Sequence, residues 1–291
     1  MARAIVGIIG GSGVYDLPGL EAIREERIET PWGVPSDALR FGRIGNTETV
    51  FLPRHGRGHR LSPSGINYRA NIDALKRAGV TDIISVSACG SFKPEIYPGV
   101  FVIVDQFIDR TFARESSFFG NGCVAHVSMA HPVAPLLQQR LVEAAKAEKI
   151  PFVSGGTYVC IEGPQFSSLA ESLAYKAAGG DVIGMTAMPE AKLAREAEIS
   201  YATVAMVTDY DCWHPKHENV DVASVLRVIE ANAGNAAKLL ARVLREFPAE
   251  HEPCPMGSDR ALDHAVLTAP EARDPGLMKK LDAVMRRVSQ K

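Results

Sequence analysis

The sequence predicts an α/β protein, in which helices flank a central mixed, largely parallel sheet to form one three-layer domain. Short apolar runs rich in β-branched residues alternate with longer segments whose apolar residues recur at helical spacing. The 291 residues are 46% hydrophobic and 23% charged, which is enough apolar material for a large core. No linker, repeat or low-complexity stretch interrupts the alternation, so it points to a single layered unit.

The expected strands are apolar runs that end in glycine or in polar residues. In chain order they cover Ala4–Gly11, Val50–Gly56, Thr81–Ser91, Gly99–Asp109, Gly156–Gly163, Asp181–Thr186 and Glu198–Thr208. Functional residues of parallel α/β sheets gather at the carboxyl ends of the strands. The residues that close these runs are therefore the first candidates for a site.

The expected helices begin and end at recognisable signals. The first has Ser64 as a candidate N-cap and Gly79 as its stop, and Ser168 with Glu171 forms a capping-box pattern before another. The remaining helices cover Val133–Lys149, Pro189–Ala197, Val222–Phe247 and Pro275–Val288. We expect a domain over residues 1–250 and a C-terminal extension over residues 251–291, whose terminal helix packs on the same domain.

Composition excludes several classes of protein. A net charge of −2 gives no basic footprint for nucleic acid. The five cysteines form no C-x-x-C pair, so neither a zinc site nor a disulfide framework is indicated, and a reducing cytoplasm is the expected location. No apolar run approaches the ~20 residues of a membrane helix, and the glycine-rich start is not a signal peptide.

Three strand ends carry residues that suit an oxyanion. Gly10–Gly13 could hold a phosphate with backbone N–H groups and the Ser12 hydroxyl, or could be a plain tight turn. It is neither a dinucleotide fingerprint nor a Walker loop. Arg54 and His55 could bind phosphate, the guanidinium bidentately, or could open a solvated basic loop. Ser87–Gly90 adds hydroxyls at a third end, and the three together favour a phosphate site.

Two carboxylates, Asp209 and Asp211, follow the last apolar strand. In extended backbone they would point to the same face, where they need a cation or a hydrogen-bond donor. The residues alone leave three interpretations open: a helix cap or surface salt bridge, a magnesium site, or recognition of the donors on an amino-purine.

Several motifs together resemble a known family. "IGGSG", "RHG", "ACGS", "DQFIDRT", "IEGPQFSS", "MTAMPE" and "VTDYDCW" are similar to the methylthioadenosine-cleaving branch of the trimeric purine nucleoside phosphorylases, collinear from about Ile5 to Phe247. The resemblance implies the nucleoside phosphorylase fold and attack of phosphate on the anomeric carbon of methylthioadenosine, which releases adenine and 5-methylthioribose 1-phosphate. It implies a homotrimer in which phosphate is a co-substrate and no metal or cofactor takes part.

The resemblance also implies a role for each matching residue. Asp209 and His55 would be catalytic, and Asp209 is the general acid or its relay. Phosphate would be held by Ser12, Arg54, His55, Ser87, Ala88 and Thr186. The base and the ribose would lie against Phe166, Ser167, Met185, Asp209 and Asp211. The methylthio group would occupy a pocket of Val222, Val225 and Leu226, with His126 and Leu267 reaching in from a neighbouring subunit.

The chemistry agrees with these roles. Breaking the glycosidic bond makes the sugar oxocarbenium-like, and a phosphate beneath it stabilises that charge. A 6-oxopurine would present a carbonyl to the two carboxylates, so we expect 6-aminopurines to be preferred. Three alternatives remain: a phosphorylase acting on adenosine or 6-oxopurine nucleosides, a non-catalytic or redox nucleotide-binding protein of the Rossmann type, and a nucleoside hydrolase that uses water.

Overall fold

The computed structural model describes residues 2–11, 17–215 and 222–289. At its centre β5 (Asp82–Ser91) runs parallel to β1 (Ile5–Gly10) on one side and to β11 (Ser200–Asp209) on the other. β4 (Thr47–Pro53) extends this parallel set beyond β1. Nearly every residue of these strands is buried, which is why they read as continuous apolar runs in the sequence.

One edge of the sheet is an antiparallel extension that the sequence analysis missed. β3 (Leu39–Ile44) pairs with β4, and β2 (Glu21–Glu26) pairs with β3. All six residues of β2 are exposed, and four of them are charged. A charged edge strand carries no period-2 apolar signal, and its charges discourage pairing with other chains.

The sheet forks at the carboxyl end of β5. There β10 (Val182–Gly184) pairs antiparallel with β5 and continues through β9 (Thr157–Ile161) to β7 (Gln106–Arg110). The other branch runs from β11 to β6 (Phe101–Ile103) and then to β8 (Phe152–Ser154), which was also missed.

The predicted single strand Gly99–Asp109 is therefore wrong. It divides into β6 and β7, because the chain exchanges partners between them. The Val104 N–H donates to Thr203 on β11, whereas the Asp105 N–H already donates to Gly156, next to β9. Apolar residues continue from β6 into Phe107 and Ile108 of β7, so only the polar pair Asp105–Gln106 marks the change of partner in the sequence.

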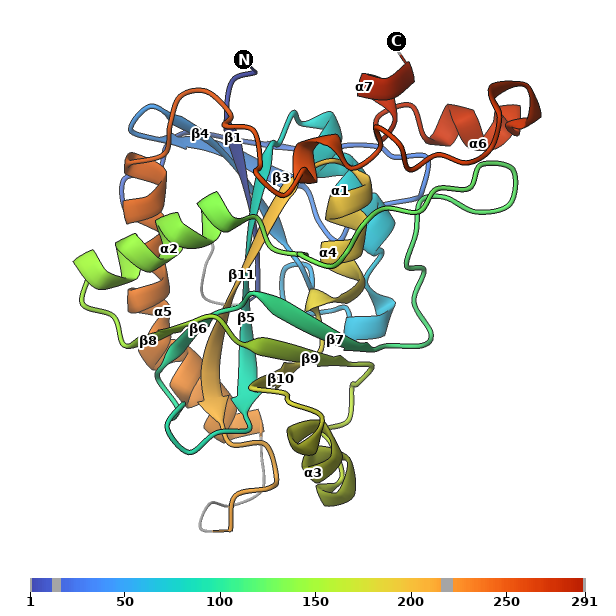
Figure 1. Cartoon of the computed structure of the whole chain (residues 1–291). Helices are drawn as coiled ribbons and strands as arrows, with labels where there is room; N and C mark the ends of the chain where they lie inside the picture. Colours follow the sequence, from blue (N-terminus) through green and yellow to red (C-terminus); the bar gives the residue numbers. More distant parts are fainter. Residues whose placement is uncertain (1, 12–16, 216–221, 290–291) are drawn as a thin grey trace.

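Helices cover both faces of the sheet, which confirms the predicted layered α/β class (Figure 1). α1 (Tyr68–Arg77) and α4 (Ala187–Glu196) pack together on one face. α2 (Pro135–Ala147) and α5 (Val222–Arg245) pack together on the other. A large cluster of buried apolar side chains lies on each side of the sheet.

Helix boundaries agree closely with the sequence signals except at the start of α1 and in the C-terminal extension. Ser64 is not the N-cap of α1, because a short 3-10 helix, η1 (Pro63–Gly65), intervenes and the Asn67 side chain accepts from the Ala70 N–H at 3.1 Å instead. Gly79, at φ +83°, ends α1 as predicted. The capping box of Ser168 and Glu171 is present at the start of α3 (Leu169–Ala177).

The C-terminal extension packs against the same core. It holds the 3-10 turns η2 (Ser258–Arg260) and η3 (Pro270–Ala272), then α6 (Pro275–Lys280) and α7 (Arg286–Ser289), so the predicted terminal helix is in fact two short ones. Leu262, Leu281 and Val284 are buried in the core cluster on the α1 and α4 side. Across the described residues, the structure has no helix long and apolar enough to span a bilayer.

Candidate active site

The carboxyl ends of the central strands bring most of the described candidate residues together. Arg54 directly follows β4, and its N–H donates to Gly10 at the end of β1. Ser87 and Ala88 lie in β5 opposite Ala205 and Met206 of β11. Met185 and Thr186 follow β10, which pairs with Gly90 and Ser91 at the end of β5. Ser12 lies outside the described residues.

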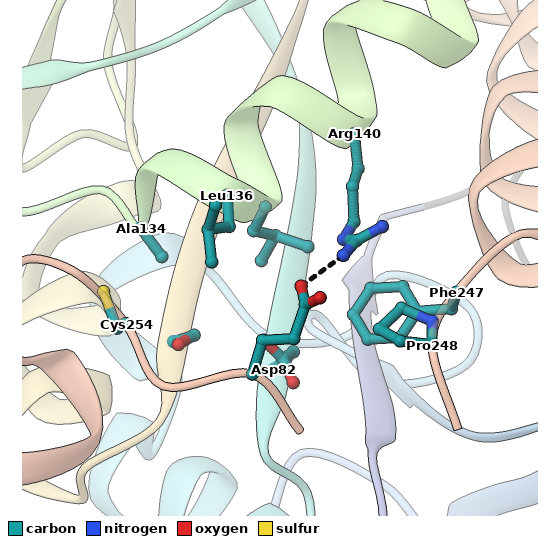
Figure 2. Close-up of a pocket in the computed structure, with 10 residues that line it drawn as sticks. Asp82, Ala134, Leu136, Arg140, Phe247, Pro248 and Cys254 are labelled. Carbon is teal, nitrogen blue, oxygen red and sulfur yellow. Dashed lines mark hydrogen bonds and ion pairs between the residues drawn. The ribbon is translucent and has the colours of Figure 1, made fainter. Parts of the chain in front are cut away.

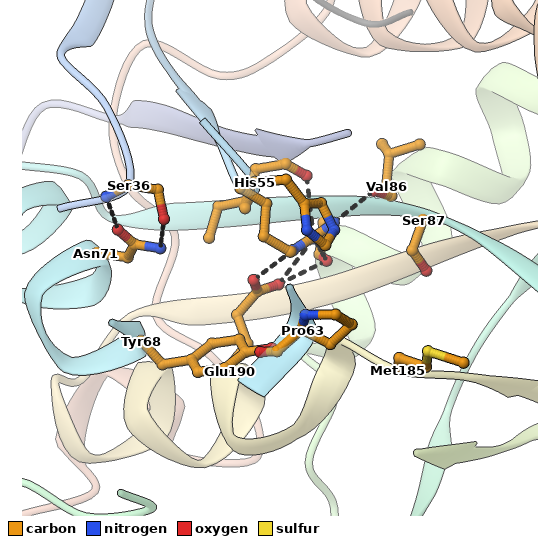
Figure 3. Close-up of polar contacts among 12 residues, drawn as sticks. Ser36, His55, Pro63, Tyr68, Asn71, Val86, Ser87, Met185 and Glu190 are labelled. Atoms are coloured by element: carbon orange, nitrogen blue, oxygen red, sulfur yellow. Dashed lines mark hydrogen bonds and ion pairs between the residues drawn. The ribbon is translucent and has the colours of Figure 1, made fainter. Parts of the chain in front are cut away.

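Arg54 is buried, and nearly all of the N–H groups of its guanidinium already donate hydrogen bonds to the protein. Its side chain is 1% exposed, and Nε and Nη2 donate to the Glu190 carboxylate at 2.8 and 3.1 Å. Nη2 also donates to the Ser85 hydroxyl at 2.6 Å, and Nη1 donates to the Val86 carbonyl at 3.0 Å. Figure 3 shows the Glu190 carboxylate pointing into this cluster. Because at most one N–H, on Nη1, stays free, the geometry does not offer the bidentate phosphate grip expected from the sequence.

His55 is held in one orientation beside this cluster. Its Nδ1 lies 2.8 Å from the Leu61 carbonyl oxygen, which can only accept, so Nδ1 carries a proton in that contact. Burial, together with the nearby Arg54 charge, lowers the pKa of His55 to about 4. The ring is therefore neutral near pH 7, and Nε2 presents a lone pair. The ring of His59 stacks on it, with centroids 4.1 Å apart.

Two hydroxyls, of Ser87 and Thr186, accompany these residues at the strand ends. Among the residues that the structure describes, the Ser87 Oγ has one long contact of 3.4 Å, to the Tyr158 hydroxyl. The Thr186 Oγ1 is buried and makes no hydrogen bond to any residue that the structure describes. Thr186 sits at the N-terminus of α4 without using its side chain as a cap. A buried hydroxyl without a partner costs free energy, so this one is suited to meet a ligand.

Asp209 is the last residue of β11 and is firmly held. Its Oδ2 accepts from the Thr208 hydroxyl at 2.7 Å, and its Oδ1 accepts from the Asp211 N–H at 2.8 Å. Burial nevertheless raises the pKa of the Asp209 carboxyl, and the Asp211 charge raises it as well. A raised pKa favours the neutral acid, which can donate a proton.

Gly90 on β5 makes room for that carboxylate. A Cβ at this position would lie 2.7 Å from Asp209 Oδ1, 3.1 Å from Ile183 Cγ2 and 3.2 Å from the Asp211 nitrogen. The pairing of β11 with β5 also shifts register between Val207 and Asp209, so the strand bulges where the carboxylate begins. Glycine is required here for close approach and not for its φ angle.

The expectation that Asp209 and Asp211 share one strand face is wrong. β11 ends at Asp209, and Asp211 has φ +51°, in the left-handed region. The two side chains are instead linked through the backbone of Asp211. Asp211 is buried, and its Oδ2 has no hydrogen bond to a described residue, as is also true of the hydroxyls of Ser167 and Ser172. Burial raises the pKa of the Asp211 carboxyl, whereas the nearby hydroxyls of Ser172 and Ser167 lower it.

The remaining candidates are more exposed. Phe166 is 46% exposed in the loop before α3. Val222 and Leu226, on the first turns of α5, are 63% and 47% exposed, and Val225 is half-buried. Within one chain the described residues leave this apolar strip uncovered.

His126 and Leu267 are brought together although 141 positions separate them in the chain. The His126 N–H donates to Ala265, and the Leu267 N–H donates to Val124, across a bridge of two extended segments. Both side chains are exposed. The C-terminal helices α6 and α7 lie at the end of the molecule opposite α3 (Figure 1).

Sequence reasoning missed several residues that hold the site. Glu190 follows the "MTAMP" run and would read as an ordinary helix residue, yet it is 1% exposed and binds Arg54, Ser85 and Tyr201. Ser172 and Arg114 were missed in the same way. A charged residue inside a family motif is the one signal that could have found Glu190, because burial of a charge requires a partner.

Two cavities lie away from these residues. One of about 20 Å³, room for about one water, is lined by residues at the opposite end of β5 and β11, Asp82 and Ser200, and by α2 and the tail (Figure 2). A second, of about 200 Å³, is lined by Asp105, His131 and Met256 among others. Neither contains a candidate site residue. Among the residues that the structure describes, no three His, Cys, Asp or Glu side chains gather in a way that would hold a metal ion.

Comparison with known proteins identifies the family. The model of the phosphorylase superfamily matches residues 5–245. An S-methyl-5′-thioadenosine phosphorylase of Bradyrhizobium diazoefficiens is 69% identical over 288 residues, covering 99% of each chain. One of Cereibacter sphaeroides is 60% identical over 286 residues, covering 98% of this chain and 99% of the relative.

Solved structures agree with this. A methylthioadenosine phosphorylase from an antarctic soil metagenomic library superposes with a TM-score of 0.91 at 45% identity, covering 98% of this chain and 99% of that one. A variant of the adenosine/methylthioadenosine phosphorylase of Schistosoma mansoni, in complex with methylthioadenosine, has a TM-score of 0.83 at 38% identity, covering 94% and 99%. The resemblance and the fold expected from the sequence are thus confirmed, and the chain belongs to the phosphorylase superfamily.

Proposed function

We propose that the protein catalyses phosphorolysis of 5′-methylthioadenosine to adenine and 5-methylthioribose 1-phosphate. The observation that best supports this activity is that Asp209, Ser87 and Thr186 come together at the strand ends. A carboxyl with a raised pKa lies there near hydroxyls that have spare hydrogen-bonding capacity. The relatives that carry the name of this activity cover almost the whole chain.

Phosphate would bind at the hydroxyls of Ser12, Ser87 and Thr186 and at the backbone of Ala88. Neutral His55 would accept a hydrogen bond from a protonated phosphate oxygen through Nε2, which is unprotonated because Nδ1 carries the ring proton toward the Leu61 carbonyl. Arg54 would contribute mainly its positive charge and one remaining N–H, because Glu190 holds the rest of the guanidinium. The bound phosphate then faces the anomeric carbon, and its negative charge stabilises the oxocarbenium-like sugar.

The base would lie between Asp209 and the loop that carries Phe166 and Ser167, with the ribose against Met185. As the glycosidic bond breaks, adenine gains electron density, and protonation by Asp209 releases it as a neutral base. The Asp211 Oδ2, buried and without a described partner, would accept from the exocyclic amine. A 6-oxopurine would leave that oxygen facing a carbonyl, which supports a preference for 6-aminopurines.

The methylthio group would lie on the strip of Val222, Val225 and Leu226. This apolar strip is exposed within one chain, and the side chains of His126 and Leu267 are exposed as well. A homotrimer, in which these two residues close the site of the next subunit, would cover both. We further propose that phosphate is the co-substrate without metal or cofactor, and that the protein works in the cytoplasm, where its five free cysteines stay reduced.

Phosphorus NMR tests the reaction directly. Incubation with methylthioadenosine and inorganic phosphate should produce a sugar 1-phosphate resonance in step with free adenine. Adenine that forms with free methylthioribose and no new phosphorus resonance would make the protein a hydrolase. Sedimentation equilibrium tests the assembly separately: a mass three times that of the 31.4 kDa chain is expected, and a monomer with full activity would refute the shared site.

A further inference from the structure

Arg114 stands at the junction of the segments that carry the candidate site. It lies in the loop after β7, inside the run "DQFIDRTFAR" whose beginning marked the family without suggesting a role. Its side chain is 1% exposed. No candidate ligand contact was assigned to it, and its donors all turn toward the protein.

The guanidinium of Arg114 binds the turn between β10 and α4. Its Nη1 donates to the carbonyl of Met185 at 2.7 Å and to that of Met188 at 2.6 Å. These two carbonyls flank Thr186, the candidate phosphate ligand. Met188 has non-helical dihedral angles, so regular helix begins only after it. The turn is thus fixed by Arg114 and not by a regular helical start.

The same guanidinium binds the end of β9, from which the base loop departs. Its Nη2 donates to the Glu162 carbonyl at 2.6 Å and lies 3.4 Å from that of Ile161. Its Nε donates to the Glu162 carboxylate at 3.3 Å. The next residues, Gly163 to Ser168, form the loop with Phe166 and Ser167.

A third element is held through Tyr68 and Ser64. Arg114 Nη1 donates to the Tyr68 hydroxyl at 3.1 Å, and that hydroxyl donates to the Pro63 carbonyl at 2.9 Å. Ser64 donates to the Glu162 carboxylate, which also accepts from the Phe112 N–H at 2.7 Å. The start of α1, the base loop and the phosphate turn therefore share one rigid junction.

We propose that Arg114 is a positioning residue that sets the phosphate subsite and the nucleoside subsite in register with each other. The planar guanidinium reaches carbonyls of two strand ends at once, which a lysine ammonium with three donors on one atom cannot reproduce. This inference rests on the proposed function, because the two subsites are those of the phosphorolysis.

The test compares Arg114→Lys with Arg195→Lys by steady-state kinetics and thermal unfolding. Arg195 is a matched control: it is also buried and also donates to backbone carbonyls, of Ser128 and His131, and its hydrogen bonds reach no candidate site residue that the structure describes. Arg114→Lys should raise KM for phosphate and KM for methylthioadenosine each by about tenfold or more, because both subsites shift. Arg195→Lys should lower Tm with both KM values within about twofold of wild type.

Two further variants sharpen the result. Thr186→Ala should raise KM for phosphate alone, which shows that the assay resolves the subsites. If Arg114→Lys does not fold, Glu162→Gln loosens the same junction more gently and should raise both KM values about threefold. Unchanged KM values in the folded variants, with only Tm lowered, would overturn the positioning role. Absence of phosphorolysis by wild type would instead overturn the proposed function, so the two failures are distinct.

Discussion

Replacing Gly90 with alanine probes the placement of Asp209 by a single methyl group. The added Cβ would lie 2.7 Å from Asp209 Oδ1, about 0.7 Å closer than the 3.4 Å at which ordinary contact begins. Gly90 does not occupy the left-handed region, so alanine brings no backbone strain. The neighbouring β5 and β11 backbones are buried and paired, and the carboxylate is therefore the group that moves.

The movement has a calculable consequence. Asp209 would lose alignment with the Thr208 hydroxyl and the Asp211 N–H, now at 2.7 and 2.8 Å. A shift of this size at a reacting group costs up to about 10²-fold in rate, or about 2.7 kcal/mol. Overpacking against Ile183 adds a loss of about 1–3 kcal/mol in unfolding free energy.

The assay is kcat/KM for methylthioadenosine at saturating phosphate, measured well below the Tm of the variant. Gly120→Ala serves as the control, because a Cβ there meets nothing within 4 Å and its backbone is outside the left-handed region. A fall of about 100-fold for Gly90→Ala and none for Gly120→Ala is expected. Activity of Gly90→Ala within about threefold of wild type would refute the role given to the Asp209 position.

Three other substitutions test separate groups. Asp209→Asn should raise kcat/KM for inosine relative to that for methylthioadenosine, because an amide can donate to a purine carbonyl. An equal loss of activity on all nucleosides would contradict the proposal that Asp209 distinguishes 6-aminopurines from 6-oxopurines. His55→Asn keeps a donor for the Leu61 carbonyl but removes Nε2, so KM for phosphate should rise about tenfold at nearly unchanged Tm; an unaltered KM would exclude His55 from the phosphate subsite. Burial raises the pKa of Glu196 to about 7, so its contribution to stability is full below about pH 4.5 and is lost as the pH rises through 7. Glu196→Gln removes this loss, and its unfolding free energy relative to wild type should improve by up to about 3 kcal/mol between pH 5 and pH 9; a difference that does not vary with pH would contradict the assignment.

The elements of the fold that could be predicted are those with a local pattern in the sequence. The buried parallel strands β1 and β5 were predicted from their apolar runs. The end of α1 was predicted from Gly79, because its φ of +83° is a backbone conformation that glycine adopts without strain. β2 lacked any such pattern, since its six residues are all exposed. The fork between β6 and β7 was missed because apolar residues occur on both sides of it, and the two polar residues between them do not show that the hydrogen-bond partners change.

Sequence patterns placed most of the candidate residues at the strand ends but did not predict their contacts. Arg54 was chosen as a phosphate ligand, yet its guanidinium is held by Glu190, 136 positions away, which no local spacing reveals. Asp211 was placed by strand alternation, which fails because φ becomes positive at that residue. Arg114 was overlooked because it binds backbone carbonyls. Every residue has a backbone carbonyl, so the sequence does not show which ones an arginine will bind.

The most direct test of the central claim is the rate of adenine release from methylthioadenosine by the purified protein, with and without phosphate, beside adenosine and inosine. Phosphate-dependent release that is fastest with methylthioadenosine and negligible with inosine is the predicted result. Release at the same rate without phosphate would contradict the account, because Ser87, Thr186 and His55 would then have no substrate to hold.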